Sequence, residues 1–229
     1  MPASTVQHDQ SAPRAAKAYK GMAMEGLIAR WYTKIRQIDE ELEALVGRVN
    51  DMLPAGSRVL EVAPGPGYLA IELAKRGYHV VGLDISASFV QIAQAKAKDA
   101  GVAVDFQRGN ASAMPLDGET FDFIVCRAAF KNFTEPVRAI EEMYRVLKPG
   151  RKALIVDLRG DASTEDINTA IKGMRLSSIN TLLTRWTFKH FLLKNAYTAE
   201  DIRQIVAQTK FALPDIHEDS IGMEIWLEK

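Results

Sequence analysis

Two carboxylates and a glycine-rich turn stand where a chain could bind a nucleotide-like cofactor. Glu61 precedes the turn Ala63-Pro-Gly-Pro-Gly67, and Asp84 follows it at about the twenty-residue spacing typical of a ribose-binding acid. Glycine has no Cβ, so the backbone of such a turn can approach a ligand closely at a helix N-terminus. An ionised carboxylate only accepts hydrogen bonds, which suits Asp84 to ribose hydroxyls. The chemistry indicated is the binding of a ribose-containing cofactor.

Two cofactor classes fit this pattern. The stretch Gly65-Pro-Gly-Tyr-Leu-Ala70 fits the dinucleotide fingerprint, with Asp84 as the acid expected downstream. The other class is S-adenosylmethionine, whose motif Glu/Asp-x-Gly-x-Gly-x-Gly occurs here with Ala63 in place of the first glycine. Glu61 separates the two, because a carboxylate beside the turn attracts an ammonium group and repels a pyrophosphate. We therefore favour S-adenosylmethionine and keep an NAD(P)-dependent oxidoreductase as the alternative.

The elements that position these residues alternate between strands and helices. Short apolar runs predict the strands Val59–Val62, His79–Asp84, Val102–Gln107, Phe121–Cys126 and Lys152–Asp157, followed by a terminal antiparallel pair over Phe211–Glu218 and Ile221–Glu228. Helical spacing follows Tyr68, Ser86 caps a helix that runs to Gly101, and Pro136 opens a helix that ends at Lys148-Pro-Gly150. Alternation of this kind predicts an α/β fold with a parallel sheet whose ligands lie at the carboxyl ends of the strands.

The segments outside this alternation define the predicted domain organisation. Residues 1–13 have almost nothing to bury and are expected to form a flexible tail. Residues 14–229 are expected to form a single domain, in which 14–53 form N-terminal cap helices and 160–197 form a helical insertion. Within the following helix, Thr198 and Asp201 match a capping box.

Composition narrows the class of protein. The chain has 229 residues, 47% hydrophobic and 25% charged, and a formal net charge of zero, which argues against a nucleic-acid-binding surface. Its single cysteine, Cys126, leaves no disulfide within one chain and no multi-cysteine metal site, so no metal is expected. The chain shows no apolar run of about eighteen residues and no secretory signal core. A cytoplasmic enzyme, monomeric or homodimeric, is the expectation.

From Arg58 to about Asp157 the sequence resembles the class I S-adenosylmethionine-dependent methyltransferases. It is most similar to the small-molecule group that includes the ubiquinone and menaquinone biosynthesis methyltransferases. The resemblance rests on five segments in order: Val59-Leu-Glu-Val-Ala-Pro-Gly-Pro-Gly67, Val81-Gly-Leu-Asp-Ile-Ser86, Gly109-Asn-Ala-Ser-Ala-Met-Pro-Leu116, Phe121-Asp122 and Glu142-Met-Tyr-Arg-Val-Leu-Lys-Pro-Gly150. It implies a Rossmann-like seven-stranded sheet, mostly parallel with a C-terminal antiparallel hairpin. It also implies S-adenosyl-L-methionine as cofactor, S-adenosyl-L-homocysteine as product and methyl transfer to a small-molecule acceptor.

The resemblance also implies roles for individual residues. The implied cofactor-binding residues are Glu61, Ala63, Gly65, Gly67, Asp84, Ile85, Asn110, Ala111 and Arg127. Glu61 would meet the ammonium group of the cofactor, directly or through water, and Asp84 would accept hydrogen bonds from both ribose hydroxyls. The pair Asn110–Ala111 would read adenine, although most relatives have aspartate at the first position. Ile85 would pack on adenine, and Arg127 would border the methionine end.

A catalytic base is less defined than the cofactor site. Phe130-Lys-Asn132 stands where relatives often carry Leu-His-His or Leu-His-Trp, so the resemblance supplies no histidine as a base. Methyl transfer needs a base only when the acceptor carries a proton that must leave. The candidates by position are Tyr19, Lys131, Asp157 and His190. A cofactor-binding regulator without chemistry is the non-enzyme alternative, but such a protein would be expected to lose Asp84 or the glycines.

The helical insertion has three interpretations. It is basic from Lys172 on, with Trp186, Phe188 and Phe191 interleaved. It could be a lid that, together with Trp31, covers a small and largely apolar acceptor. It could instead attract an anionic substrate or a membrane surface that carries a lipophilic acceptor, which leaves peripheral membrane contact open. The third interpretation is RNA recognition by stacking and phosphate contacts, as in an RNA methyltransferase.

Overall fold

The computed structural model describes residues 19–20, 25–35, 40–173, 193 and 195–229. Its helices are α1 (Gly26–Ile35), α2 (Glu40–Met52), α3 (Tyr68–Lys75), α4 (Ala87–Asp99), α5 (Pro136–Val146), α6 (Thr164–Gly173) and α8 (Ala199–Val206), with the 3-10 helix η2 (Phe130–Asn132). Its strands are β1 (Arg58–Val62), β2 (His79–Asp84), β3 (Asp105–Arg108), β4 (Phe121–Arg127), β5 (Leu147–Leu158), β6 (Asp215–Glu218) and β7 (Gly222–Glu228). The predicted flexible tail over residues 1–13 lies outside the described residues.

The strands form one seven-stranded sheet in the order β3-β2-β1-β4-β5-β7-β6. All neighbours from β3 to β5 are parallel, and β7 runs antiparallel to both β5 and β6. The register aligns Glu61 of β1 with Gly82 of β2 and with Val125 of β4. The Rossmann-like sheet with a C-terminal antiparallel hairpin is therefore confirmed. An open dinucleotide-binding sheet orders its strands 3-2-1-4-5-6, so β7 between β5 and β6 distinguishes this topology from it.

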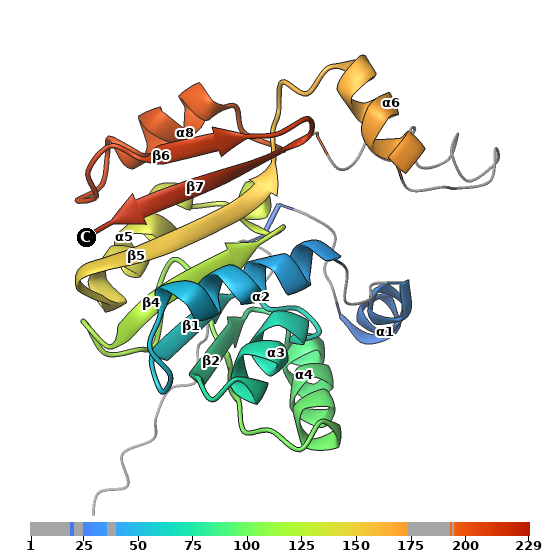
Figure 1. Ribbon diagram of the computed structural model, residues 1–229, viewed down its shortest axis with the longest axis vertical. Helices are drawn as coiled ribbons and strands as arrows, with labels where there is room; N and C mark the ends of the chain where they lie inside the picture. Colours follow the sequence, from blue (N-terminus) through green and yellow to red (C-terminus); the bar gives the residue numbers. More distant parts are fainter. Residues whose placement is uncertain (1–18, 21–24, 36–39, 174–192, 194) are drawn as a thin grey trace, which may run out of the picture.

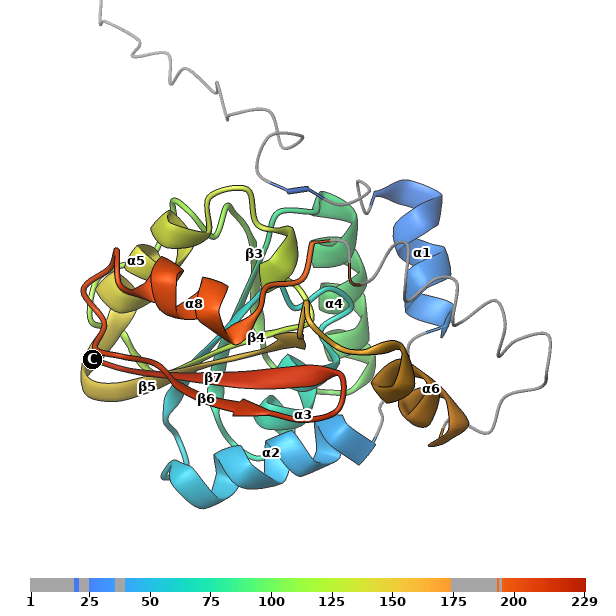
Figure 2. The ribbon, with the colours of Figure 1, turned by 90° about the horizontal axis from the view of Figure 1, so that it is seen from above.

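Helices cover both faces of the sheet and divide the core into two layers (Figures 1 and 2). One face packs against α2, α3 and α4, and the other against α5 and α8. Alternate residues of β4 point into the two layers: Phe123 and Val125 face the first layer, and Ile124 and Cys126 face the second. The central strands are apolar on both faces for this reason. The arrowheads of β4 and β5 point to the side of the molecule where α1 and α6 lie (Figure 1).

Local signals in the sequence set several helix ends. Ser86 accepts a hydrogen bond from Phe89 N at the start of α4. Pro136 occupies the first turn of α5, where its missing N–H costs nothing. Thr198 and Asp201 exchange the hydrogen bonds of a capping box at α8. All three signals are confirmed.

Three predicted boundaries are wrong. The first terminal strand was expected to begin at Phe211, but β6 begins at Asp215. The third strand was expected over Val102–Gln107, but β3 begins at Asp105, because strand pairing with β2 starts only there. The fifth strand was expected to follow a helix that ends at Lys148-Pro-Gly150. Instead α5 ends at Val146 and β5 begins at Leu147, whose register partner is Phe121. Pairing with a neighbouring strand determines where these strands begin, and a local sequence pattern does not contain that information.

Two helices precede the first strand, as predicted, but they are held differently. The apolar side chains of α2 pack against α3 and the sheet. α1 packs against α4 instead: Ala29 is buried and the ring of Tyr32 lies 5.9 Å from that of Phe89, whereas Leu27 is 80% exposed. Polar contacts also hold this end of α1: the Glu25 carboxylate accepts hydrogen bonds from Ala87 N and Ser88 N at the start of α4, each at 3.0 Å. No helix in the described part of the chain is long and apolar enough to cross a membrane.

Candidate cofactor and acceptor site

Two strained alanines mark the carboxyl ends of adjacent strands. Ala63 follows β1 and Ala128 follows β4, with φ angles of 58° and 57°. A non-glycine residue in the left-handed region costs about 1–2 kcal/mol, and such strain clusters at functional sites. The backbone holds both alanines in place, because Ala63 N donates to Leu83 O and Ala128 N donates to Val156 O. The strain therefore lies at the edge of the sheet where the sequence predicts a ligand.

Asp84 joins the ends of β1 and β2. One carboxylate oxygen accepts a hydrogen bond from Gly65 N at 2.9 Å, and the other accepts one from Ser86 N at 2.8 Å. Asp84 is 5% exposed, and burial raises its pKa to about 6 against the effect of these hydrogen bonds. A carboxylate offers about four acceptor positions, so Asp84 keeps acceptor capacity for ligand hydroxyls. Its position fits the predicted ribose-binding role.

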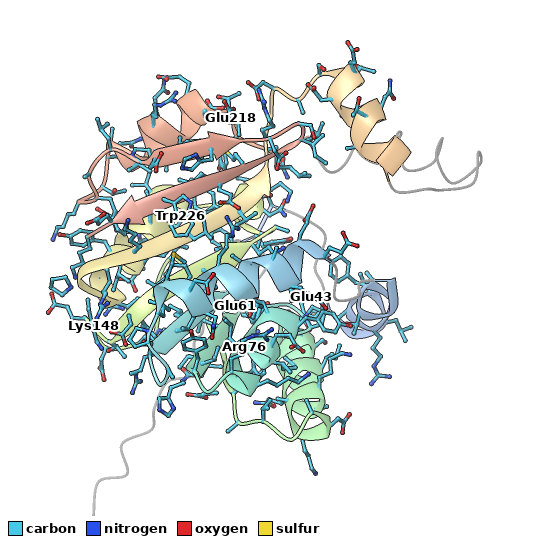
Figure 3. All side chains as sticks on the ribbon, viewed as in Figure 1. Glu43, Glu61, Arg76, Lys148, Glu218 and Trp226 are labelled. Atoms are coloured by element: carbon cyan, nitrogen blue, oxygen red, sulfur yellow. The ribbon has the colours of Figure 1, made fainter. Side chains whose placement is uncertain are left out.

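Glu61 is a buried residue of β1, which the glycine turn follows (labelled in Figure 3). Its side chain accepts a hydrogen bond from Ala70 N at 2.9 Å, which ties β1 to the first turn of α3. Burial raises the pKa of Glu61 to about 8, although the Ala70 N–H and the Arg127 charge oppose the shift. A positively charged ligand group beside this carboxyl would favour its ionised form. Glu61 thus suits a cation, with Arg127 already close to it.

The two glycines of the turn differ in what surrounds them. Gly67 has φ 79° and is the N-cap of α3. A Cβ there would lie 2.6 Å from Phe106 Cζ and 2.9 Å from Ala93 Cβ, so packing of α4 and β3 already requires glycine. At Gly65, with φ 54°, a Cβ would meet only Phe89, at 4.0 Å. Gly65 is therefore the glycine whose open side can face a ligand.

The remaining predicted cofactor residues lie at neighbouring strand ends. Asn110 Oδ1 accepts a hydrogen bond from Ser112 N at 2.9 Å and shapes the loop after β3, in which Ala111 lies. Arg108 Nε donates to Ile85 O at 3.3 Å and links that loop to the end of β2. Arg127 ends β4 and pairs with Glu41 at 3.2 Å. Their roles toward adenine and methionine stay predictions.

A buried ion pair lies at the ends of β4 and β5. Lys131 Nζ lies 2.6 Å from Asp157 Oδ1, and both residues are buried. Asp157 also accepts hydrogen bonds from Lys131 N and Leu158 N. These contacts fix η2 on the sheet, so the structure shows Lys131 and Asp157 engaged with each other rather than poised as free bases.

Tyr19 reaches the same place from the N-terminal segment. Its hydroxyl accepts a hydrogen bond from Asn132 Nδ2 at 3.0 Å. Burial, with the charges of Tyr32 and Asp84 adding to it, raises the pKa of Tyr19 to about 12. A phenol with this pKa keeps its proton at neutral pH, so the structure favours Tyr19 as a hydrogen-bond donor over Tyr19 as a base.

Several predicted residues cannot be placed. Trp186, Phe188, His190 and Phe191 lie outside the described residues, and Trp31 belongs to α1 but its side chain is not described. The lid assignment and the His190 base therefore stay predictions. Lys20, Asn132, Asn195 and Tyr197 were not singled out as site residues in the sequence, because the hydrogen bonds of their side chains join positions far apart in the chain. Within the described residues, no three His, Cys, Asp or Glu side chains gather as a metal site.

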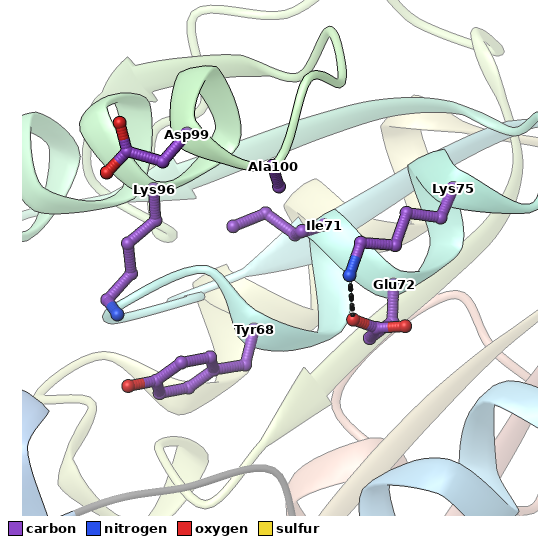
Figure 4. A pocket seen from close by; sticks show the side chains of 7 residues that line it. All are labelled: Tyr68, Ile71, Glu72, Lys75, Lys96, Asp99 and Ala100. Atoms are coloured by element: carbon purple, nitrogen blue, oxygen red, sulfur yellow. Dashed lines mark hydrogen bonds and ion pairs between the residues drawn. The ribbon is translucent and has the colours of Figure 1, made fainter.

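Two surface grooves lie away from the strand ends. One, of about 320 Å³, runs between α3 and α4 and is lined by Tyr68, Ile71, Glu72, Lys75, Lys96, Asp99 and Ala100 (Figure 4). The other, of about 340 Å³, lies beside the terminal hairpin and includes Met52 and Trp226. None of the predicted cofactor residues lines either groove. The candidate site is therefore assigned from the residues at the strand ends and their polar contacts.

The strain at Ala63 gives a first testable prediction. We expect Ala63→Gly to stabilise the protein by about 0.5–1 kcal/mol, because relief of the left-handed strain exceeds the added chain entropy of glycine. Ala95→Gly, at an exposed position inside α4, should destabilise it by about 1 kcal/mol. Urea denaturation of both variants measures the difference. A loss of stability in both would show that Ala63 is not strained.

Comparison with known families agrees with this geometry. A family model described as a methyltransferase domain matches residues 60–155. A demethylmenaquinone methyltransferase of Deinococcus radiodurans is 34% identical over 108 residues, which cover 46% of this chain and 45% of the relative. The chain thus spans about half the length of the curated relatives it matches. The matched region includes the glycine turn, Asp84 and the start of β5, and it confirms the resemblance to class I methyltransferases.

Solved structures share the fold. A methyltransferase of Aquifex aeolicus, described as dependent on S-adenosylmethionine, has a TM-score of 0.61 at 19% identity, with 83% of this chain and 98% of that chain covered. The [4+2]-cyclase SpnF has a TM-score of 0.54 at 18% identity, with 82% and 80% covered. The two proteins share one fold, but their names describe different reactions. The fold alone therefore does not fix the reaction.

Proposed function

We propose, from the match of residues 60–155 to a methyltransferase-domain family model, that the protein is an S-adenosylmethionine-dependent methyltransferase that acts on a small-molecule acceptor. The observation that carries the proposal is the arrangement at the ends of β1 and β2, where Asp84 holds the glycine turn at Gly65 N. The family match covers this arrangement, and the sheet order with β7 between β5 and β6 argues against the dinucleotide alternative.

The residues present fit the proposed cofactor. Asp84 supplies an acceptor-only group for ribose hydroxyls, and Gly65 leaves the turn open on the side away from Phe89. Glu61 supplies a buried carboxyl that a positive charge would ionise. When bound, S-adenosylmethionine supplies an electrophilic methyl group on a sulfonium. The chain's own residues then bind and orient the cofactor and the acceptor, and they exclude water from the site.

The predicted lid belongs to the same proposal. Trp31, Trp186, Phe188 and Phe191 would cover the acceptor, while η2 and the Lys131–Asp157 pair would form the rigid side of its site. The small-molecule acceptor follows the named relatives, which include demethylmenaquinone methyltransferases. An RNA acceptor is the third interpretation of the basic insertion, and no described residue favours it over the lid.

Transfer of a labelled methyl group tests the proposed activity. The protein is incubated with S-adenosylmethionine labelled in its methyl group and with panels of phenols, amines, thiols and carboxylic acids. We expect label to move to one class, and to none of them with Asp84→Ala. A protein that binds S-adenosylhomocysteine but moves no label to these classes or to RNA would contradict the transferase proposal and favour a cofactor-binding regulator.

A further inference from the structure

We infer that the acceptor carries a carboxylate, which Tyr19, Lys20 and Tyr197 bind at the carboxyl ends of β4 and β5. The inference rests on the proposed function and adds the substrate class to it. It is argued from the hydrogen-bond donors of these three side chains that have no acceptor among the described residues, where three segments of the chain meet.

Three distant segments converge at these strand ends. Lys20 N donates to Asn132 O at 2.7 Å, which sets the N-terminal segment against η2. Gly160 N donates to Tyr197 O at 2.8 Å, and Arg159 and Tyr197 form an isolated β-bridge that brings the residues before α8 beside the end of β5. The ring of Tyr197 lies 5.8 Å from that of Phe130, measured between centroids. The side chains of all three segments therefore share one place.

Among the residues that the structure describes, no acceptor is paired with the hydroxyl proton of Tyr19. Its oxygen accepts a hydrogen bond from Asn132 Nδ2, and an amide N–H can only donate. The Tyr19 proton therefore needs another acceptor. The raised pKa of Tyr19 keeps that proton in place at neutral pH. Asn195 Nδ2 donates to Asn132 Oδ1 at 3.4 Å, which orients the amide that supports Tyr19.

Lys20 and Tyr197 repeat the same pattern. Lys20 Nζ donates to the Tyr197 hydroxyl at 3.0 Å, so the proton of Tyr197 is also available to donate. An ammonium carries three donors, and one of them is used here. Among the residues that the structure describes, no carboxylate forms an ion pair with Lys20. Two phenols and one cation thus lie on segments that meet at these strand ends, and the described contacts leave their remaining donors without an acceptor.

The charge around this cluster selects the ligand. Asp157 would repel an anion, but Lys131 neutralises it at 2.6 Å. Asp84 keeps a charge that acts on Tyr19, and its two oxygens accept hydrogen bonds from Gly65 N and Ser86 N at the neighbouring strand ends. Lys20 is the cation of this cluster, and its single positive charge matches one carboxylate better than a phosphate dianion, which the Asp84 charge would also disfavour. The two oxygens of a carboxylate also match two hydroxyl donors.

A matched panel of fragments tests this inference on the full chain loaded with S-adenosylhomocysteine. Benzoate, phenylacetate and cinnamate are compared with their carboxamides by ligand-observed NMR titration. We expect the carboxylates to bind about tenfold more tightly than the amides, as one charge-assisted contact allows. Lys20→Met should remove this preference, and Tyr197→Phe should reduce it severalfold.

Lys96→Met is the matched control, since Lys96 Nζ also lies over a tyrosine ring, 4.7 Å from the centroid of Tyr68, in the groove between α3 and α4 (Figure 4). It should leave the preference unchanged. Equal binding of carboxylates and amides to the wild type, or an unchanged preference in Lys20→Met, would overturn the inference. Calorimetry with S-adenosylhomocysteine comes first: binding without a carboxylate preference contradicts this inference alone, whereas no binding contradicts the proposed function as well.

Discussion

Replacement of Asp84 by alanine is expected to weaken the binding of S-adenosylhomocysteine by about 2–4 kcal/mol, or roughly 30- to 1000-fold in Kd. The ribose hydroxyls would lose a buried, charged acceptor, and no other described carboxylate accepts hydrogen bonds from both the Gly65 turn and Ser86 N. Isothermal titration calorimetry measures the change. The same two N–H groups lose their acceptor, so we also expect about 1–3 kcal/mol of lost stability.

Two further variants separate binding from folding. Asp84→Asn keeps one acceptor oxygen and loses the charge, so its affinity should fall between those of the wild type and Asp84→Ala. Asp105→Ala removes an exposed carboxylate of β3 that accepts only from Gln107 among the described contacts, and it should bind as the wild type does. Wild-type affinity in a folded Asp84→Ala protein would remove Asp84 from the cofactor site.

Lys131→Met is expected to destabilise the protein by about 3–5 kcal/mol, which is the typical cost of leaving one member of a buried ion pair without its partner. Lys131 is 6% exposed, and its ammonium lies 2.6 Å from Asp157 Oδ1. Methionine fills a similar volume but supplies no charge, so Asp157 stays buried with only backbone donors. Urea denaturation gives the free energy of unfolding.

Lys148 provides the matched control, because its ammonium pairs with Asp122 at 3.0 Å while its side chain is 38% exposed. It lies at an edge of the molecule, near the start of β5 (Figure 3). Lys148→Met should cost at most about 1 kcal/mol, as exposed pairs do. The double variant Lys131→Met with Asp157→Asn should recover part of the loss, since no unpaired charge remains buried. Equal costs for Lys131→Met and Lys148→Met would show that the buried pair does not fix η2.

Much of the fold could be predicted because its signals are local. The central strands are short apolar runs that occupy both layers of the core, and the caps at Ser86 and Thr198 act within three residues. The carboxylate and glycine motifs predicted where the ligand edge of the sheet lies. Asp84 could be singled out because its residue type and its position at the end of an apolar run can both be identified from the sequence.

The rest depends on contacts between distant residues. Lys131 was a candidate base, and only the fold shows that Asp157 neutralises it. Lys20 and Tyr197 carry no motif, since they meet across 177 positions of the chain. That Gly67 faces the cofactor stays a prediction, and only the fold shows a second reason for glycine there, because a Cβ would clash with Phe106. These differences arise from packing and burial, which a pattern of residue types does not specify.

The central claim is that the edge of the sheet formed by Glu61, Gly65 and Asp84 binds S-adenosylmethionine rather than a dinucleotide. Isothermal titration calorimetry of the full chain with S-adenosylhomocysteine and, separately, with NAD and NADP tests it most directly. We expect micromolar binding of the thioether to the wild type and no heat from either dinucleotide. In Asp84→Ala the affinity for the thioether should fall, because the ribose hydroxyls lose their acceptor. Tight binding of NAD or NADP without binding of S-adenosylhomocysteine would contradict it.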